Sequence, residues 1–167
     1  MHSIKEFEEI GLFNIAWYEH SLTTYTYNAL EKMEKIKLHL NKDSDGSFSR
    51  SLITFGIKGI TPLLVAEILN YEYGIGVRAG SYCVYEFSRR INNTKLEEDN
   101  KIAEQVKCGI TSNIPGSVRA SFGMYNTIED ADRLISALKE ISENGLEYYE
   151  TKYTMNEQTG EWTPKSI

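Results

Sequence analysis

Cysteine is scarce in this sequence: only Cys83 and Cys108 occur in 167 residues. Two thiols cannot build a disulfide framework, and the 24 residues between them match no zinc-ligand spacing. Free thiols persist in reducing compartments, so we expect both to be unpaired and the protein to be cytoplasmic.

Long hydrophobic runs are also missing. No stretch approaches the roughly 20 apolar residues of a membrane span, and the first twenty residues carry acidic side chains where a signal peptide would be apolar. Basic residues are outnumbered, with 18 Lys and Arg against 24 Asp and Glu and a net charge of -6. Because nucleic acid and anionic membranes require clustered positive charge, we expect neither as a partner.

What is present is a set of helical periodicities. Apolar residues recur at spacings of three and four over residues 14–35 and again over residues 126–145, which predicts two amphipathic helices. We expect Thr127 to cap the second helix and Gly145 to close it. A third helix is expected to follow the N-cap residue Thr61.

Strand patterns alternate with these helices. Short β-branched or alternating segments predict strands at 36–40, 51–59, 74–78 and 117–125, and a polar turn is expected at 41–47. Two further helical segments are expected at 86–91 and 97–110. This order predicts an α+β fold, with a small antiparallel or mixed sheet and helices packed on one face.

The C-terminal residues 146–167 are expected to extend a domain that spans residues 1–145. They are rich in aromatic and polar side chains. This tail is open to three interpretations: a last hairpin around the letters NEQTGE, a surface that covers a partner, or a disordered segment.

Three residues are candidates for chemistry. Cys83 follows a glycine-punctuated strand, where a loop thiol near cations can act as a nucleophile, although a lone cysteine is more often a small buried hydrophobe. Arg78 and Arg119 lie in two similar strand segments, GVRAG and SVRAS. On neighbouring strands their planar forks can bind one carboxylate; the alternative is a pair of structural salt bridges.

The three histidines offer no further support for a site. None of His2, His20 and His39 lies near Cys83 in the sequence, and their spacing does not suggest a metal. His20 falls on the predicted helix 14–35, where a solvated side chain is the expected state.

Two segments carry a family resemblance. YGIGVRAGSYC and GSVRASFGMYNTIEDADRLISALKEI resemble the C-terminal domain of class V aminotransferase-fold enzymes, which use pyridoxal phosphate and include cysteine desulfurases and selenocysteine lyases. Family members carry an R-A/T-G-x-x-C loop and, further on, a V-R-A-S-x-x-x-Y-N-T-x-E element, and both are matched here in order. The resemblance covers roughly residues 10 to 143.

The resemblance implies a role for each candidate. Cys83 matches the loop cysteine that, in desulfurases, attacks the sulfur of a cysteine substrate bound to the cofactor and becomes a persulfide. Arg119 matches the arginine that binds the substrate α-carboxylate, and Arg78 helps to shape the same site. Ser81 and Tyr82 stand where many desulfurases carry a histidine near the cysteine, which is a departure from the family pattern.

A second departure concerns the cofactor. The family's pyridoxal-phosphate lysine lies in a large domain that precedes this one, and no Ser/Thr-x-His-Lys element occurs here. The resemblance therefore implies that the large domain is a partner, in cis or in trans, that the chain is inactive without it, and that the complete enzyme binds an amino acid such as cysteine and can form a homodimer. No cofactor is expected on this chain alone, because the Schiff base requires that lysine.

Two other functions stay open. The first is a non-catalytic protein-interaction module that keeps the fold without the chemistry, in which Cys83 is unreactive and the arginines are held in salt bridges. The second is a redox or metal protein that uses Cys83 and Cys108, which their spacing disfavours.

Overall fold

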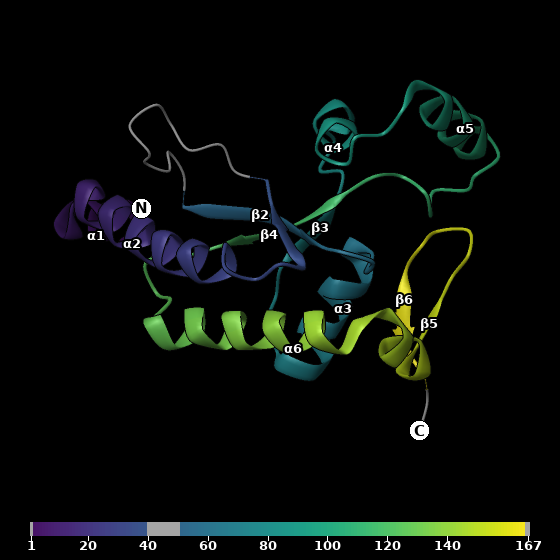
Figure 1. The fold of residues 1–167 in the computed structure, drawn as a ribbon. Helices are drawn as coiled ribbons and strands as arrows, with labels where there is room; N and C mark the ends of the chain where they lie inside the picture. Colours follow the sequence, from purple (N-terminus) through teal and green to yellow (C-terminus); the bar gives the residue numbers. More distant parts are fainter. Residues whose placement is uncertain (1, 40–50, 166–167) are drawn as a thin grey trace.

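The computed structural model describes residues 2–39 and 51–165 of the chain. The polar turn predicted at 41–47 lies outside these residues. Figure 1 shows the elements in chain order: α1 (His2–Ile10), α2 (Leu12–Leu30), β1 (Ile36–Leu38), β2 (Leu52–Ile57), α3 (Pro62–Tyr73), β3 (Arg78–Gly80), α4 (Tyr85–Ile91), α5 (Leu96–Lys107), β4 (Ser117–Ser121), α6 (Ile128–Lys152), β5 (Tyr153–Met155) and β6 (Trp162–Pro164).

The central sheet has four strands in the order β1-β2-β4-β3. Every neighbouring pair is antiparallel, so the predicted antiparallel sheet is confirmed. β2 and β4 form the middle of the sheet, and β3 is an edge strand that pairs with β4. The α+β architecture predicted from the order of the elements is therefore correct.

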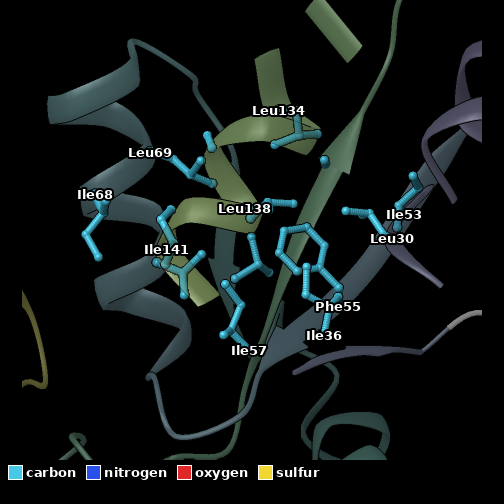
Figure 2. Close-up of a cluster of buried hydrophobic side chains, with 14 of the residues drawn as sticks. Leu30, Ile36, Ile53, Phe55, Ile57, Ile68, Leu69, Leu134, Leu138 and Ile141 are labelled. Atoms are coloured by element: carbon cyan, nitrogen blue, oxygen red, sulfur yellow. The ribbon is translucent and has the colours of Figure 1, made fainter. Parts of the chain in front are cut away.

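The hydrophobic core lies on one face of this sheet. Ile53, Phe55 and Ile57 of β2 are buried at alternate positions, as a half-buried strand requires. Figure 2 shows them packed against Leu30 from α2 and Leu138 from α6. Burying each such side chain stabilises the fold by about 1.5–3 kcal/mol, so this face supplies much of the driving force.

The N-terminal helical region differs from the prediction. The expected helix over 14–35 begins earlier, at Leu12, and ends at Leu30, and a further helix, α1, precedes it. Gly11 separates the two with φ of 87°, a conformation that glycine adopts without steric cost. Residues 31–35 leave the helix as turns before β1, which the continuous apolar spacing concealed.

The segment from α3 to β3 is confirmed at its start and shifted at its end. Thr61 caps α3 by accepting a hydrogen bond from the backbone N–H of Leu64, as predicted. The helix runs to Tyr73, and Gly74 closes it in the left-handed conformation with φ of 65°. The strand expected at 74–78 instead begins at Arg78, because its pairing with β4 starts there.

Helix α6 runs past the glycine expected to end it. Gly145 has non-helical angles, φ 76° and ψ 177°, and marks a kink, after which the helix continues to Lys152. At its start, the Asp130 carboxylate accepts hydrogen bonds from the Thr127 N–H and the Asn126 amide, which confirms the predicted cap region. These bonds lower the pKa of Asp130, the backbone bond from Thr127 most.

The C-terminal segment forms a hairpin, the first of the three interpretations. β5 and β6 pair as a two-stranded antiparallel sheet. Tyr149, Tyr153 and Trp162 are buried in the same hydrophobic cluster as the central sheet. The Trp162 indole donates a hydrogen bond of 3.1 Å to the Thr61 hydroxyl, which fastens the hairpin to the start of α3.

Residues 81–116 leave the sheet as an excursion that carries α4 and α5. Figure 1 shows these two helices on the opposite side of the sheet from α6. The tip of the C-terminal hairpin holds the far end of this excursion, because the N–H groups of Thr111 and Ser112 donate to the Gln158 carbonyl at 2.7 and 3.2 Å. None of the helices in the described ranges is both long and apolar enough to cross a bilayer.

Candidate active site

Arg78 and Arg119 are direct partners across the β3–β4 pair. Arg119 lies between the buried residues Val118 and Ala120, so its side chain points to the face of the sheet opposite the core. Arg78, its register partner, shares that face. Arg78 is exposed and Arg119 is half-buried. The two arginines therefore lie on neighbouring strands, which is the condition under which both forks could bind one carboxylate.

The two guanidiniums are not held in salt bridges within the described part of the chain. The ion pairs there involve other residues, such as Arg89 and Arg90 with Glu86 and Lys152 with Glu72. Like charges directly opposite each other on paired strands repel. A pair of cations with no carboxylate between them favours an anion as their ligand.

The aromatic ring of Tyr82 lies beside both cations. Its centroid is 5.7 Å from the Arg78 guanidinium carbon and 5.1 Å from that of Arg119. Its single hydroxyl proton lies between two carbonyl acceptors, that of Ser117 at 2.5 Å and that of Arg78 at 2.9 Å. We call Arg78, Arg119 and Tyr82 the arginine–tyrosine cluster.

Burial raises the pKa of the Tyr82 phenol, against the opposing effects of the bond to Ser117 and of the two arginines. The hydroxyl is thus a proton donor at neutral pH. No sequence pattern selects Tyr82, because the strand register is what places its ring against two arginines.

Cys83 follows this ring directly in the chain. Tyr82 and Cys83 both have positive φ, 55° and 59°, which non-glycine residues rarely adopt. A turn closes over them, since the Val84 N–H donates to the Ser81 carbonyl at 2.9 Å. The Cys83 thiol is free and exposed, so it is not the buried small hydrophobe that was the alternative.

The other thiol and the imidazoles lie on different elements. Cys108 is free and caps the end of α5. His20 is on α2, within 3.5 Å of the Thr24 hydroxyl. His39 follows β1 and is half-buried, and burial lowers its pKa to about 4. Within residues 2–39 and 51–165, no group of three His, Cys, Asp or Glu is arranged to bind a metal.

A cavity of about 170 Å³ lies where the segment between α3 and β3, the end of β4 and the start of α6 approach one another. Its lining includes Gly76, Ser121, Asn126 and Asp130, but not the arginine–tyrosine cluster or Cys83. The arginines and the thiol therefore border a different part of the surface, on the face away from the core.

An exposed aromatic surface lies near the start of α6. Phe13 and Trp17 on α2 are 81% and 65% exposed, and Tyr125 is 82% exposed. The Tyr18 hydroxyl donates to the Asn126 carbonyl at 2.8 Å, which brings α2 next to the turn that holds Tyr125. We call Phe13, Trp17 and Tyr125 the aromatic patch.

Comparison with known proteins identifies the family. The family model for aminotransferase class V matches residues 2–134. The chain belongs to the class V aminotransferase family. The resemblance noted from the two arginine segments is thereby confirmed at the level of the family.

The similar proteins within this family are cysteine desulfurases. A probable cysteine desulfurase of Staphylococcus aureus is 32% identical over 142 residues, which is 84% of this chain and 28% of that protein. A probable cysteine desulfurase of Halobacterium salinarum is 29% identical over 80% of this chain and 26% of its own length. The chain thus spans just over a quarter of these class V relatives.

Solved structures give the same answer for the fold. An apo cysteine desulfurase from Thermococcus onnurineus has a TM-score of 0.65 and 25% identity, with 84% of this chain and 29% of that one covered. A cysteine desulfurase from Escherichia coli superposes with a TM-score of 0.58 at 23% identity, over 85% of this chain and 29% of that one. The second likeness concerns the fold only.

Proposed function

We propose that this chain is the part of a cysteine desulfurase that binds the substrate α-carboxylate and presents the thiol that receives sulfur. The observation that carries the proposal is the arginine–tyrosine cluster followed directly by the exposed Cys83, in a chain that belongs to the class V family. The whole activity requires more protein, because the chain spans just over a quarter of its relatives.

Carboxylate binding is assigned to the two arginines. Arg119 is half-buried beside Arg78, and a guanidinium fork forms two parallel hydrogen bonds to a carboxylate. Partial burial strengthens such charge-assisted bonds, because solvent screens them less. Arg119 would bind the α-carboxylate, and Arg78 would add a second positive charge to the same site.

Cys83 would receive the sulfur atom as a persulfide: its thiolate would attack the sulfur of the substrate cysteine, the Cβ–S bond would break, and Cβ would keep the electron pair and take up a proton, which leaves alanine. Its exposure leaves the thiol accessible, and its position after the ring of Tyr82 keeps it close in sequence to the carboxylate site. No imidazole is near it along the chain, so activation by a neighbouring histidine of this segment is not part of the proposal.

Pyridoxal phosphate, the cofactor of the family, supplies the electron sink for such chemistry when bound. We do not assign its site to the residues of this chain, because the resemblance implies a cofactor lysine in another domain. Lys35 and Lys37 donate hydrogen bonds to the carbonyls of Ser142 and Ile91. We therefore expect the cofactor lysine on the part of the relatives that this chain lacks.

The aromatic patch is the proposed contact with that missing part. Large apolar side chains that are 65–82% exposed are costly unless another surface covers them. The patch joins α2 to the turn after β4, the strand that carries Arg119. A domain seated there would lie at the end of the strand that provides the carboxylate site.

A chimera tests the proposal. This chain would replace the matching segment of the Staphylococcus aureus relative. Sulfide release from L-cysteine would be measured with pyridoxal phosphate and a thiol reductant present, because the reductant is needed to release the persulfide sulfur as sulfide. We expect activity in the chimera, loss of sulfide release in Cys83→Ser, and a KM at least tenfold higher in Arg119→Lys. Cys108→Ser is the matched control and is expected to leave the rate unchanged.

Two outcomes would each exclude one role, that of Cys83 or that of Arg119. An active chimera in which Cys83→Ser retains full sulfide release would exclude the persulfide role. An active chimera with an unchanged KM in Arg119→Lys would exclude the carboxylate role.

The aromatic patch also favours a second candidate, a protein-interaction module without chemistry. That function predicts normal partner binding in the Cys83→Ser and Arg119→Lys variants and no sulfide release in any chimera. Under this function, Trp17→Ala is the variant that should weaken partner binding. A cytoplasmic location stays a prediction under either function.

A further inference from the structure

The ring of Tyr82 lies beside the Arg78 and Arg119 guanidiniums, and neither of these forms an ion pair within the described chain. We propose that Tyr82 is a positioning residue that presets the Arg78 and Arg119 guanidiniums for a small carboxylate. The inference rests on the proposed function and adds to it a residue that neither the sequence nor the family resemblance assigned a role.

The first step is electrostatic. Arg78 and Arg119 are register partners, so their positive charges are held close by the strand pairing itself. The face of an aromatic ring carries negative electrostatic potential and attracts a guanidinium within about 6 Å. The ring of Tyr82 is within that range of both, at 5.7 and 5.1 Å, so one ring offsets part of the repulsion of the pair.

The second step concerns the hydrogen-bond donors. A guanidinium attracted to an aromatic face keeps its N–H groups, whereas one paired with a carboxylate side chain uses them. Within residues 2–39 and 51–165, the side-chain hydrogen bonds and ion pairs include none donated by Arg78 or Arg119. The ring therefore orients both forks while leaving their donors available to a ligand.

The third step is the anchoring of the ring. The Tyr82 hydroxyl shares its one proton between the Ser117 carbonyl on β4 and the Arg78 carbonyl on β3, so it contacts both strands of the pair. Its positive φ turns the chain back so that the ring faces the strand it has just left. Because Cys83 comes next in the same turn, the anchored ring also fixes the position of the Cys83 backbone.

The ligand is therefore a small monocarboxylate such as an α-amino acid, held by the in-plane N–H groups of the two forks. The test uses this chain and two probes, acetate and L-alanine, titrated at constant ionic strength. L-Alanine carries the α-carboxylate of an amino acid but no thiol that air oxidation could couple to Cys83 as a mixed disulfide. The readout is the NMR signal of each Arg78 and Arg119 Nε–Hε group, together with contacts between these groups and the Tyr82 ring protons.

In the unsubstituted chain we expect ring contacts to both arginines, upfield-shifted Hε signals, and carboxylate-dependent changes at both. Tyr82→Leu removes two cation–π contacts, so its affinity for either probe should fall about fivefold or more. Tyr82→Phe keeps the ring but loses the anchoring hydroxyl, so its affinity should lie between those of Tyr82→Leu and the unsubstituted chain. Tyr125→Leu, which replaces an exposed tyrosine of the aromatic patch, is the matched control and should change nothing at the arginines.

Two results would overturn the positioning role. The first is wild-type carboxylate affinity in a Tyr82→Leu chain whose amide spectrum is otherwise unchanged. The second needs no variant: if saturation with acetate abolishes the contacts between the Tyr82 ring and both arginines, then the ring competes with the ligand. The proposed function fails differently, through the absence of any carboxylate-dependent shift at Arg78 or Arg119 while the ring contacts are present.

Discussion

Replacement of Trp162 by alanine measures how far the C-terminal hairpin belongs to the fold. The indole is only 6% exposed, lies in the main hydrophobic cluster, and donates a hydrogen bond to the Thr61 hydroxyl at the cap of α3. Truncation of a large buried aromatic side chain costs about 3–5 kcal/mol, through lost burial and the cavity left behind. That is a large share of the 5–15 kcal/mol by which a typical domain is stable.

The free energy of unfolding would be measured by urea denaturation, followed by circular dichroism. We expect Trp162→Ala to lose about 3–5 kcal/mol, and Trp162→Phe, which keeps an apolar ring but no indole N–H, to lose about 1–2 kcal/mol. The other tryptophan, Trp17, is 65% exposed and serves as the matched control. Trp17→Ala should change the stability by no more than about 0.5 kcal/mol.

Tryptophan fluorescence gives an independent measurement. The chain has two tryptophans, so Trp17→Phe leaves Trp162 as the single indole, and its emission should be that of a buried ring that shifts to the red on unfolding. If Trp162→Ala unfolds at the same urea concentration as the unsubstituted chain, the packing of the hairpin against α3 contributes nothing and the reasoning is refuted.

Three further predictions concern the sheet and the helix cap. A β-carbon at Gly116 would lie 2.9 Å from the Gly80 backbone, so Gly116→Ala should lower the free energy of unfolding by about 1–3 kcal/mol in urea, whereas Gly76→Ala, with open space around it, should not. Burial lowers the pKa of His39 from 6.5 to about 4, so the unfolded chain binds a proton first as the pH falls between these values. The free energy of unfolding should therefore fall by about 1–2 kcal/mol as the pH drops from 6.5 to about 4, after allowance for solvent screening. A His39→Gln variant that kept the same pH dependence would contradict this. Hydrogen bonds lower the pKa of Asp130, so its contribution to stability is present above the unfolded-state pKa and is lost as the pH falls through the lower folded-state value. Asp130→Ala should therefore be less stable than the unsubstituted chain at pH 7. The two proteins should converge in acid, as measured by thermal unfolding.

Much of the fold follows from local sequence patterns. The spacing of apolar residues predicted α6, and the Thr61 cap predicted the start of α3. Both predictions succeed because burial of one helical face and hydrogen bonding of the first N–H groups are local requirements. Gly145 was misjudged for a related reason. Glycine usually ends a helix, but here Tyr149 is buried beyond it, and that tertiary packing carries the helix on after a kink.

The candidate site was predictable only in part. The similar segments GVRAG and SVRAS placed Arg78 and Arg119 at two strand ends, and the register shows that the two strands are neighbours. Tyr82 could not be chosen in the same way. Its contacts join residues 4 and 35 positions away through a turn with positive φ, and no periodicity encodes such a turn.

The bond between Trp162 and Thr61 joins residues 101 positions apart, which has a kinetic consequence. Closing so large a loop lowers the entropy of the chain before the contacts at its ends can stabilise it. Such pairings therefore tend to form after local helices and nearby strand pairs. The central sheet and α6 can therefore collapse first, with the hairpin docking afterwards. A refolding experiment should then contain a phase in which the environment of Trp162 changes after most of the helical signal has returned.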